Sequence, residues 1–580
     1  MDIFSCTPEM WIEDEDNLSK LLEDHKVMDK IPLLNVNELH HLKDTTLVRF
    51  RGMVQDMHSP EYYLEKFEII NLTTSEKSVK SGKYHDGAVS SEDETIDFNS
   101  DKNVTAERET YVVISVPGIN DWVQVIEEEK YKISSDTSVT NKQAKRSHEE
   151  METDDIDKEK PSTSTEDVPK KSCTENSIDT NPKTQTLSKE YILNFPLPTR
   201  TGKACHLKVY RDTSELKLND VYEFVGFLAI DPITEAMYQE SCETDNKMEM
   251  EVLHPPSSLV PRIHCVSFKK LKHNNPLLNT KEDELDVNRI NFIRKELLIV
   301  LTQLLLGDEL AAEYLICHLI SEIYLRRDLM PLGKFSLNLS NVPMFENLDF
   351  AVELYKFIEN FIPKSHYLPM TLENMNDLCF IPKKDYECNR LTSGILQLSP
   401  NTHLVLDETK LRAGKLNSAG VNSVKAIARA VKNQKVTYDF NYYPLEFDCD
   451  IPFLILSEGK SLINVDVHVV LKPEKICLET FAEIIVAARH FLKPELLNDI
   501  RKFLTLARLA KYEISENVEE LVQNEFVNMR QRGGATADDL HSLLVLARLL
   551  CISEGKSKLD EECWKKACKL EEQRKARITR

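Results

Sequence analysis

The chain has 580 residues, of which 41% are hydrophobic, and it carries a formal net charge of −23 at pH 7. This length and apolar content correspond to roughly three to four domain-sized units and exclude a fold with a single core. The acidic balance argues against a protein whose main task is to neutralise phosphates, because strong DNA binding requires Lys and Arg gathered on one face.

The sequence carries no signature of secretion, of a membrane span or of a metal site. The first 30 residues are acidic and lack a basic stretch followed by an apolar core, and no apolar run is long enough to cross a bilayer. The 13 cysteines are scattered, without a Cys-x-x-Cys pair or a nearby His pair at zinc spacing. We therefore expect free intracellular thiols, no metal ligands, no cofactor and no membrane partner.

The N-terminal segment, residues 1–131, opens with acidic amphipathic stretches and then shows strand patterns. Along 47–56 apolar and polar side chains alternate, with Val48, Phe50, Gly52 and Val54 on one face and Arg49, Arg51 and Gln55 on the other. This alternation predicts a half-buried strand, and Gly52 within it suggests a bulge or a barrel corner. A second strand is predicted over 111–116, before a Pro-Gly turn. The segment therefore forms the first part of a mainly β domain.

Residues 132–190 contain no aromatic side chain and are dominated by Ser, Thr, Asp, Glu, Lys and Pro. Such a composition cannot bury enough apolar surface to offset chain entropy, so it predicts a disordered acidic linker. Within this segment Lys142, Lys145 and Arg146 form a short basic cluster. The cluster is a candidate nuclear-import signal, and an ordinary solvated charge cluster explains it equally well.

Residues 191–270 return to strand patterns, over 207–210 and 221–228, with a turn at 218–220. Together with the strands before the linker, they are predicted to close one OB-like β-barrel that carries the linker as a long insertion. Such barrels often bind single-stranded nucleic acid through aromatic and basic side chains. Because apolar groups occupy both faces and basic charge is sparse, the aromatic residues here are assigned to the core: Tyr210, Tyr222, Phe224 and Phe227.

Residues 281–475 mix helical and strand patterns. Apolar spacing predicts a helix over 310–324 that ends at Arg326-Arg327-Asp328, with His318 at the edge of its core stripe. A strand is predicted over 333–340, and the loop 341–347 follows it, where a nucleotide-binding fold places its phosphate loop. A phosphate loop needs glycines, a Lys and a Ser or Thr, and this loop has neither glycine nor lysine. The Gly-Lys-Ser triplets at 459–461 and 555–557 lack the first glycine of that motif.

The centre of this region is the apolar run 403–406, which ends in the adjacent acids Asp407 and Glu408. A buried strand that ends in two carboxylates is a Walker-B-like signature, since ligands of open α/β sheets bind at the carboxyl ends of strands. The same pattern also arises wherever a strand runs into a polar turn. A polar helix over 422–432, a hairpin over 436–447 and a second strand over 452–456 follow, in the order expected for a nucleotide-site sheet with an inserted hairpin.

Residues 476–580 are predicted to form a helical lid. Helical patterns cover 500–508 and 522–530, and Thr536 with Asp539 resembles a capping box that begins a further helix. The expected fold is thus α+β and α/β multidomain. It comprises an OB-like barrel with a disordered insertion, a degenerate AAA+-like α/β domain over 281–475 and the lid.

The order of these elements distantly resembles the AAA+ helicase subunits called minichromosome maintenance (MCM) proteins. The closer resemblance, over nearly the whole chain, is to the MCM complex-binding protein family. The motifs that carry it are Phe50-Arg51-x-Met53-x-Gln55-Asp56-Met57, Leu193-Asn-Phe-Pro-Leu-Pro198, Ser257-Ser-Leu-Val-Pro-Arg-Ile-His264, Ala311-Ala-Glu-Tyr-Leu315, Arg326-Arg-Asp328, Pro331-Leu-Gly-Lys-Phe335, Leu404-x-x-Asp407-Glu408-Thr409 and Ala535-Thr-Ala-Asp-Asp-Leu-His541.

Membership of that family implies a nuclear protein without enzymatic activity that binds MCM helicase subunits and enters an alternative MCM assembly in place of one subunit. It also implies roles in DNA replication, the cell cycle and cell division, in MCM supply or unloading from chromatin, and in sister chromatid cohesion. It implies no small-molecule substrate and no strong direct DNA binding. The sequence does not identify the partner-binding residues.

The residues themselves indicate why such a relative would not be a helicase. Besides the phosphate loop, an active subunit needs a polar sensor, a Ser-Arg-Phe-Asp finger and an Arg in the lid. Here Ser457 and Glu458 stand at the sensor, no Ser-Arg-Phe occurs, and Asp538 at the lid position would repel a γ-phosphate. On this interpretation Asp407 and Glu408 are vestigial. Two alternatives stay open: an active AAA+ ATPase of the MCM type, and an OB-fold single-strand nucleic-acid binder.

Overall fold

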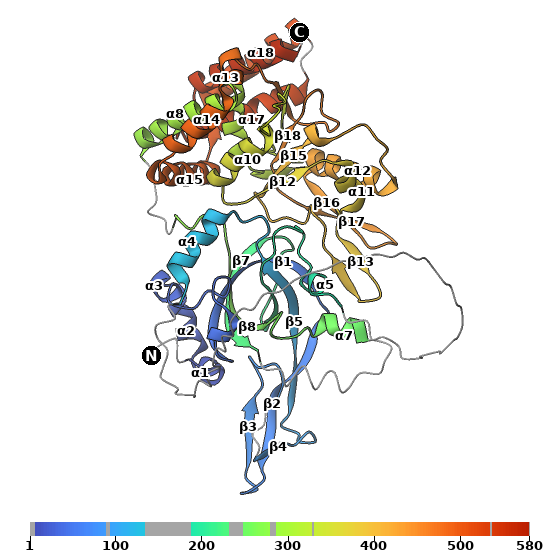
Figure 1. Ribbon diagram of the computed structural model, residues 1–580. Helices are drawn as coiled ribbons and strands as arrows, with labels where there is room; N and C mark the ends of the chain where they lie inside the picture. Colours follow the sequence, from blue (N-terminus) through green and yellow to red (C-terminus); the bar gives the residue numbers. More distant parts are fainter. Residues whose placement is uncertain are drawn as a thin grey trace, which may run out of the picture. The chain divides into compact units, whose positions relative to one another are not determined.

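The computed structural model describes residues 6–88, 93–133, 187–230, 247–278, 286–327, 330–514, 516–533 and 536–578. It is a mixed α/β structure with several sheets (Figure 1). Most of the predicted linker, including Lys142, Lys145 and Arg146, lies outside the described residues. In the part of the chain that is described, no helix is long and apolar enough to cross a membrane, and no cluster of His, Cys, Asp and Glu could hold a metal ion.

The first 270 residues, here called the β half, are built around strands that come from both sides of the predicted linker. Its strands are β1 (Leu47–Met57), β2 (Glu61–Asn71), β3 (Lys77–Ser81), β4 (Glu94–Ile96), β5 (Val104–Ser115), β6 (Ala204–Val209), β7 (Val221–Ala229) and β8 (Arg262–Lys270). Its helices are α1 (Pro8–Glu13), α2 (Glu15–Leu21), α3 (His25–Met28), η2 (Leu39–His41), α4 (Asp121–Tyr131), α5 (Lys189–Leu193) and α7 (Lys247–Leu253).

The strand pairings of the β half return to their starting strand. β1 pairs with β7, β7 with β8, β8 in parallel with β6, β6 with β5, and β5 again with β1. β2 continues from β5 and carries β3 and β4 in an arm that extends away from these five strands (Figure 1). The core assignment of Tyr222, Phe224 and Phe227 is confirmed, whereas Tyr210 is half-buried.

The prediction that β1 is half-buried is wrong, because Arg49 and Gln55 on its polar face are each only 1% exposed. Arg49 donates a 3.0 Å hydrogen bond to the Ile31 carbonyl and forms a 3.2 Å ion pair with Glu223. Gln55 donates to the Asn194 carbonyl at 2.5 Å. The segments that precede β1 and follow the predicted linker therefore cover this face, which periodicity alone does not report.

Gly52 does not mark the bulge of β1. The register of β1 against β5 shifts between Val54 and Asp56 instead. A Cβ atom at Gly52 would lie 2.5 Å from the Val113 side chain, so this position needs glycine because the two strands pack closely.

The remainder of the chain to β19, here called the α/β body, is organised on a parallel sheet in the order β12-β15-β18-β11-β19. These strands are β11 (Leu337–Ser340), β12 (Ser365–Pro369), β15 (His403–Asp407), β18 (Phe453–Leu456) and β19 (Val467–Val470). Val405 and Leu454 belong to one apolar cluster, and their neighbours Leu404 and Ile455 to another. Both faces of the sheet are therefore covered, as parallel sheets require.

Helices and short strands surround this sheet. The helices are α8 (Val287–Leu304), α9 (Glu309–Leu319), α10 (Phe350–Phe361), α11 (Leu372–Asp377), η4 (Glu408–Lys410) and α12 (Ser418–Asn433). The further strands are β9 (Leu325–Arg327), β10 (Met330–Leu332), β13 (Lys383–Asp385), β14 (Arg390–Thr392), β16 (Lys435–Asp439) and β17 (Pro444–Asp448). The helix predicted over 422–432 and the hairpin predicted over 436–447 are confirmed as α12 and as β16 with β17.

Two predictions on the N-terminal side of the sheet are wrong. The helix predicted to reach residue 324 ends at Leu319, and the strand predicted from residue 333 begins at Leu337. Because Ile320 and Ile323 continue the apolar helical spacing, the predicted helix extends beyond its observed end. The chain instead forms β9 paired with β10, where Arg326 donates to the carbonyls of Gln434 (3.2 Å) and Cys449 (2.5 Å). These carbonyls, which are distant in sequence, fix the local structure around Arg326.

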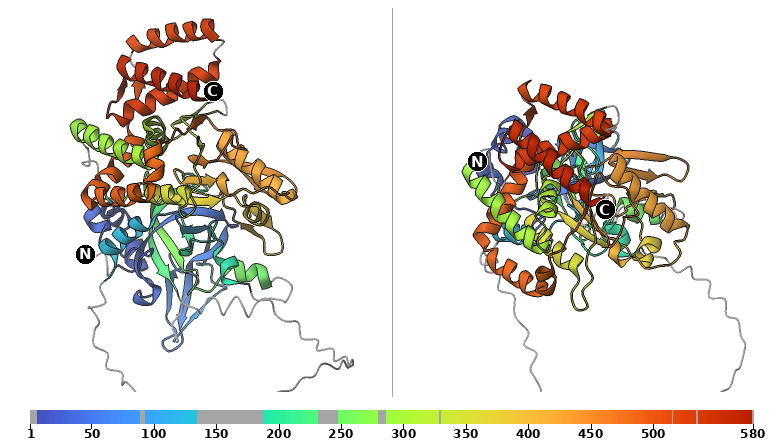
Figure 2. Two further views of the ribbon diagram at one scale, coloured as in Figure 1. Left: turned by 45° about the horizontal axis from the view of Figure 1, so that its top comes forward. Right: turned by 90° about the horizontal axis from the view of Figure 1, so that it is seen from above.

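The C-terminal residues are helical, as predicted. The elements are α13 (Lys475–Glu479), α14 (Phe481–Phe491), α15 (Pro494–Leu509), α16 (Glu516–Gly533), α17 (Ala537–Ser553) and α18 (Glu561–Ile578), with the short strands β20 (Glu513–Ile514) and β21 (Lys558–Leu559). α14 and α15 pack against α8. In the left view of Figure 2 the last helices of the chain, drawn in red, lie at the top.

Buried hydrogen bonds join the β half to the α/β body. Asn120 and Trp122 both donate to the Ile362 carbonyl, at 2.7 and 3.0 Å. Asn219 donates to the Tyr438 hydroxyl at 2.8 Å. Because these groups are buried and paired across the junction, separating the two halves would leave them without partners.

Candidate functional site

The carboxyl ends of β11, β15 and β18 meet at one edge of the parallel sheet, because the three strands are adjacent and parallel. This is the edge at which open α/β sheets bind ligands. Asp407 is the last residue of β15, so the strand predicted to end at the two acids is confirmed, and it ends at this edge. Glu408 begins the turn η4 directly after it.

Both oxygens of the Asp407 carboxylate are used within the fold. The Tyr367 hydroxyl on β12 donates to Oδ2 at 2.5 Å. The backbone N–H and the hydroxyl of Thr409 donate to Oδ1, at 2.9 and 2.6 Å. Burial and the nearby carboxylate raise the pKa of Tyr367, which keeps the hydroxyl protonated as a donor. Asp407 is fully buried and acts as a cap that ties β12 to η4.

Glu408 links the end of β15 to the loop after β18. Its carboxylate accepts hydrogen bonds from the Ser461 hydroxyl at 2.8 Å and from the Leu462 N–H at 3.3 Å. Burial raises the pKa of Glu408 and the Asp407 charge adds to this shift, while the two hydrogen bonds oppose it. Ser461, the last residue of a Gly-Lys-Ser triplet, thus serves the fold as a donor to Glu408.

The loop after β11 forms the wall of a hollow of about 260 Å³, which Thr409 and Lys410 complete. Asp349 caps α10 at this point by accepting from the Val352 N–H at 3.3 Å, and it also pairs with the Lys410 ammonium. Lys410 is the one cation among the described residues that line the hollow, and Asp349 neutralises it. A phosphate placed here would meet the carboxylates of Asp349 and Glu346.

The first backbone donors of the same loop are also occupied. Asn341 N–H donates to the Glu458 carbonyl and Val342 N–H to the Ser457 carbonyl, both at 3.1 Å. A phosphate cradle requires such N–H groups to point at the ligand. The residues present at this edge therefore do not fit a nucleotide with its magnesium ion.

The capping box predicted at the start of a lid helix is confirmed. Thr536 and Asp539 form the capping box of α17, with the Asp539 N–H donating to the Thr536 hydroxyl at 3.3 Å. The Thr536 hydroxyl and N–H donate to the Asp539 carboxylate at 2.7 and 3.0 Å. These two bonds, with the Lys575 ammonium nearby, lower the pKa of Asp539 to about 2. Asp538 is exposed in the first turn of the same helix.

Replacing Glu408 by Gln tests how this acid is used. The folded pKa of Glu408 is raised, so its contribution to stability is present below its ordinary pKa and is lost as pH rises through the raised value. We expect Glu408→Gln to change the unfolding free energy by less than about 1 kcal/mol. Its stability relative to wild type should increase from pH 4 to pH 8. Thermal unfolding of both proteins over that range measures this, and a variant that loses stability relative to wild type as pH rises would contradict it.

Sequence reasoning missed a hollow between α8 and α14, of about 660 Å³. Phe292 on α8 and Phe491 on α14 line it and are 49% and 44% exposed. Ile299 and Val486 on the same two helices are also exposed. We call the two lining side chains, Phe292 and Phe491, the α8/α14 patch. The signal in the sequence was that α8 has apolar residues outside its core stripe, but periodicity does not say which of them a neighbour covers.

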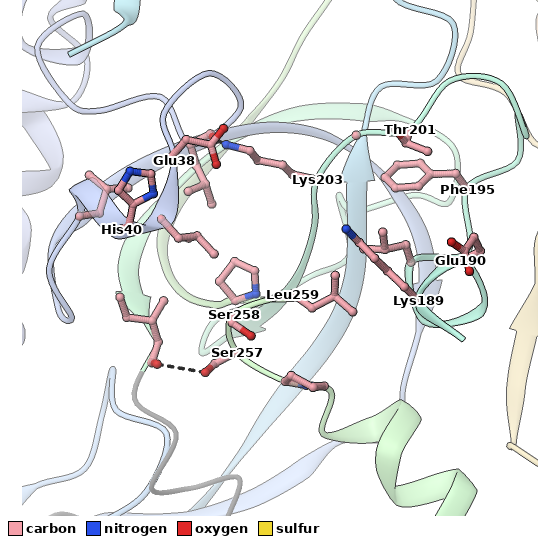
Figure 3. A pocket seen from close by; sticks show the side chains of 18 of the residues that line it. Glu38, His40, Lys189, Glu190, Phe195, Thr201, Lys203, Ser257, Ser258 and Leu259 are labelled. Carbon is pink, nitrogen blue, oxygen red and sulfur yellow. Dashed lines mark hydrogen bonds between the residues drawn. The ribbon is translucent and has the colours of Figure 1, made fainter. Parts of the chain in front are cut away.

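A further hollow, of about 1040 Å³, lies in the β half (Figure 3). Its walls are mostly apolar, and Figure 3 shows the Lys203 ammonium beside the Glu38 carboxylate. Lys203 donates to the carbonyls of Leu34 (2.9 Å) and Asn37 (2.5 Å), and burial lowers its pKa. Its charge thus holds the segment before β1 against the start of β6.

Known proteins match this chain over nearly its whole length. The family model described as "Mini-chromosome maintenance replisome factor" matches residues 18–578. A Drosophila melanogaster protein named "Mini-chromosome maintenance complex-binding protein" is 41% identical over 599 residues, spanning 100% of this chain and 97% of the relative. Proteins of that name from Mus musculus and Homo sapiens are 41% and 40% identical, each spanning 96% of this chain and 92% of the relative.

Proposed function

Since this chain belongs to the mini-chromosome maintenance complex-binding protein family, we propose that it binds subunits of the MCM helicase complex and does not itself hydrolyse nucleotide. The family match over residues 18–578 carries the proposal, because it includes the β half, the α/β body and the C-terminal helices together. The relatives' name states that they bind the mini-chromosome maintenance complex.

The finer fold assignment belongs to the same proposal. The β half is an OB-like barrel, which the cyclic pairing β1-β7-β8-β6-β5 supports. The α/β body is a degenerate AAA+-like domain with a helical lid. Support comes from its parallel sheet, with Asp407 at the end of the inner strand β15, and from the helices that follow β19.

A body of this kind could occupy one subunit position beside MCM subunits in a ring. AAA+ subunits associate side by side through heterologous contacts, so a chain with a similar body can take one position. At that position the shared nucleotide pocket would stay incomplete, because Asp407 is a buried cap and Asp349 neutralises Lys410. We propose that this nuclear assembly serves DNA replication, through MCM supply or unloading from chromatin, and sister chromatid cohesion.

The α8/α14 patch is the proposed contact for an MCM subunit. Exposed large apolar side chains from two packed helices around a hollow are typical of a groove that receives the apolar face of a partner helix. The charged residues that line the same hollow are Arg289, Lys493 and Glu495, and Arg289 pairs with Asp499, so apolar contact rather than charge would carry the binding. The competing hypothesis is that the acidic N-terminal stretches or the linker bind MCM subunits alone.

Affinity capture tests the proposal. The full chain, used as bait in nuclear extract, should recover MCM subunits both with ATP and after ATP has been removed, as read by mass spectrometry. Capture that requires hydrolysable ATP would favour the AAA+ ATPase alternative. Salt-sensitive capture of oligonucleotides without MCM subunits would favour the single-strand binder.

A further inference from the structure

A fourth cavity, of about 250 Å³, lies at the junction of the β half and the α/β body. Its walls come from residues 220–221 and 270–274 on one side, and from 363–364, 400–401 and the end of α15 on the other. Lys364 directly precedes β12, so the cavity lies at the amino ends of the parallel strands. This is the edge opposite to Asp407 and Glu408, and the cavity is separate from the site described above.

Lys364 forms one inner wall of this cavity and is 6% exposed. Its ammonium donates to the Ser399 hydroxyl at 3.0 Å and to the Pro400 carbonyl at 2.6 Å. Both acceptors are neutral, and no carboxylate in the described residues forms an ion pair with Lys364. A buried ammonium without a counter-ion costs several kcal/mol in an apolar setting.

Arg508, near the end of α15, is the second buried cation and is 9% exposed. Its Nη2 donates to the Leu319 carbonyl at 2.5 Å and to Nε2 of His403 at 2.8 Å. Its Nε is buried without a hydrogen-bond partner among the described residues. In well-ordered proteins such an unpaired donor commonly indicates an ion or a water that completes the site. The guanidinium therefore has one donor that no described residue accepts.

The acids nearest to these two groups do not contact them directly. Burial and the Arg508 charge lower the pKa of Lys364 to about 7, and Asp450 and Asp220 offset only part of that shift. Burial lowers the pKa of His403 far below its usual range, so its imidazole is neutral and accepts from Arg508. Glu322 and Asp450 attract Arg508 through space, and Asp450 also attracts Lys364, but no described carboxylate forms an ion pair with either group.

The rim of the cavity adds further positive charge. Lys270 and Lys272 are exposed at its edge. Asp220 is the one carboxylate among the described residues that line the cavity, and it pairs with Lys270 at 2.5 Å. An anion that enters would therefore meet Lys272 first and the two buried cations behind it.

We propose that this cavity binds a small phosphate-type oxyanion, inorganic phosphate or pyrophosphate, between the Lys364 ammonium and the Arg508 guanidinium. Guanidinium groups present donors that match the geometry of phosphate oxygens, and charge-assisted hydrogen bonds are about twice as strong as neutral ones. Because the walls come from both the β half and the α/β body, the bound anion links the two. Anion binding thereby stabilises the junction through mass action.

The test is a titration of the purified full chain with phosphate and with pyrophosphate at constant ionic strength, with chloride as the reference salt. Calorimetry and thermal unfolding should both report saturable binding with a Kd below about 1 mM. Lys364→Met, which keeps the aliphatic stem, should weaken binding at least tenfold. Lys272→Glu at the exposed rim should weaken it severalfold without affecting the fold. Lys269→Met, on an exposed side chain outside the cavity, is the matched control and should bind as wild type.

Three results would overturn the proposal. The first is the absence of saturable phosphate or pyrophosphate binding. The second is an equal response in wild type, Lys364→Met and Lys272→Glu, which would place any anion elsewhere. The third is binding of a single-stranded oligonucleotide that depends on Lys272 while free phosphate and pyrophosphate do not bind, which would make the cavity a nucleic-acid contact.

Discussion

Replacing Asp407 by Ala is expected to lower the unfolding free energy by about 3–4 kcal/mol, because three donors lose their acceptor at once. These donors are the Tyr367 hydroxyl and the N–H and hydroxyl of Thr409, all within 2.9 Å of the carboxylate. Asp407 is fully buried, so water cannot replace it without rearrangement. Urea unfolding followed by circular dichroism measures the loss.

Asp407→Asn is the matched control, since the amide keeps one acceptor oxygen and nearly the same volume. We expect it to cost less than half as much as Asp407→Ala. An Asp407→Ala variant as stable as wild type would contradict a structural role. Such a result would mean that the wild-type Asp407 carboxylate is not needed for the fold and is free to bind a metal or nucleotide, as the AAA+ ATPase alternative requires.

The second large effect is expected at the α8/α14 patch. Phe292→Glu places a charge on an apolar side chain that is 49% exposed, so the fold should tolerate it. If a partner helix covers this side chain, the charge becomes buried and binding should weaken at least 30-fold, about 2 kcal/mol. Quantitative capture of MCM subunits by the variant and by wild type measures this ratio.

Leu72→Glu supplies the control, because Leu72 follows β2 in the β half and is 63% exposed. It should bind MCM subunits as wild type does. Unchanged binding by Phe292→Glu would remove the patch from the proposal and favour the acidic N-terminal stretches or the linker as the binding element.

Local patterns predicted the elements whose signals lie within a few residues. The strand ending at Asp407, the hairpin of β16 and β17, and the capping box of Thr536 are of this kind. The end of α9 was predicted wrongly, because Ile320 and Ile323 keep the helical spacing while Arg326 is held by distant carbonyls. Tertiary contacts overrode local propensity there.

In the candidate site, too, local signals were predicted and contacts distant in sequence were not. The sequence predicted that Asp407 and Glu408 end a strand, but not how their oxygens are used. Tyr367 lies 40 positions before Asp407, and Ser461 lies 53 positions after Glu408. The buried pair Lys364 and Arg508 carries no motif at all, because elements far apart in sequence bring the two side chains to one cavity.

The most direct test of the central claim mixes the purified full chain with purified MCM subunits in the absence of nucleotide. Mass photometry and size-exclusion chromatography then report whether a complex forms and with what stoichiometry. The account predicts a defined complex of fixed stoichiometry that contains this chain and MCM subunits and forms without ATP. The absence of any complex between the purified components at micromolar concentrations would contradict it.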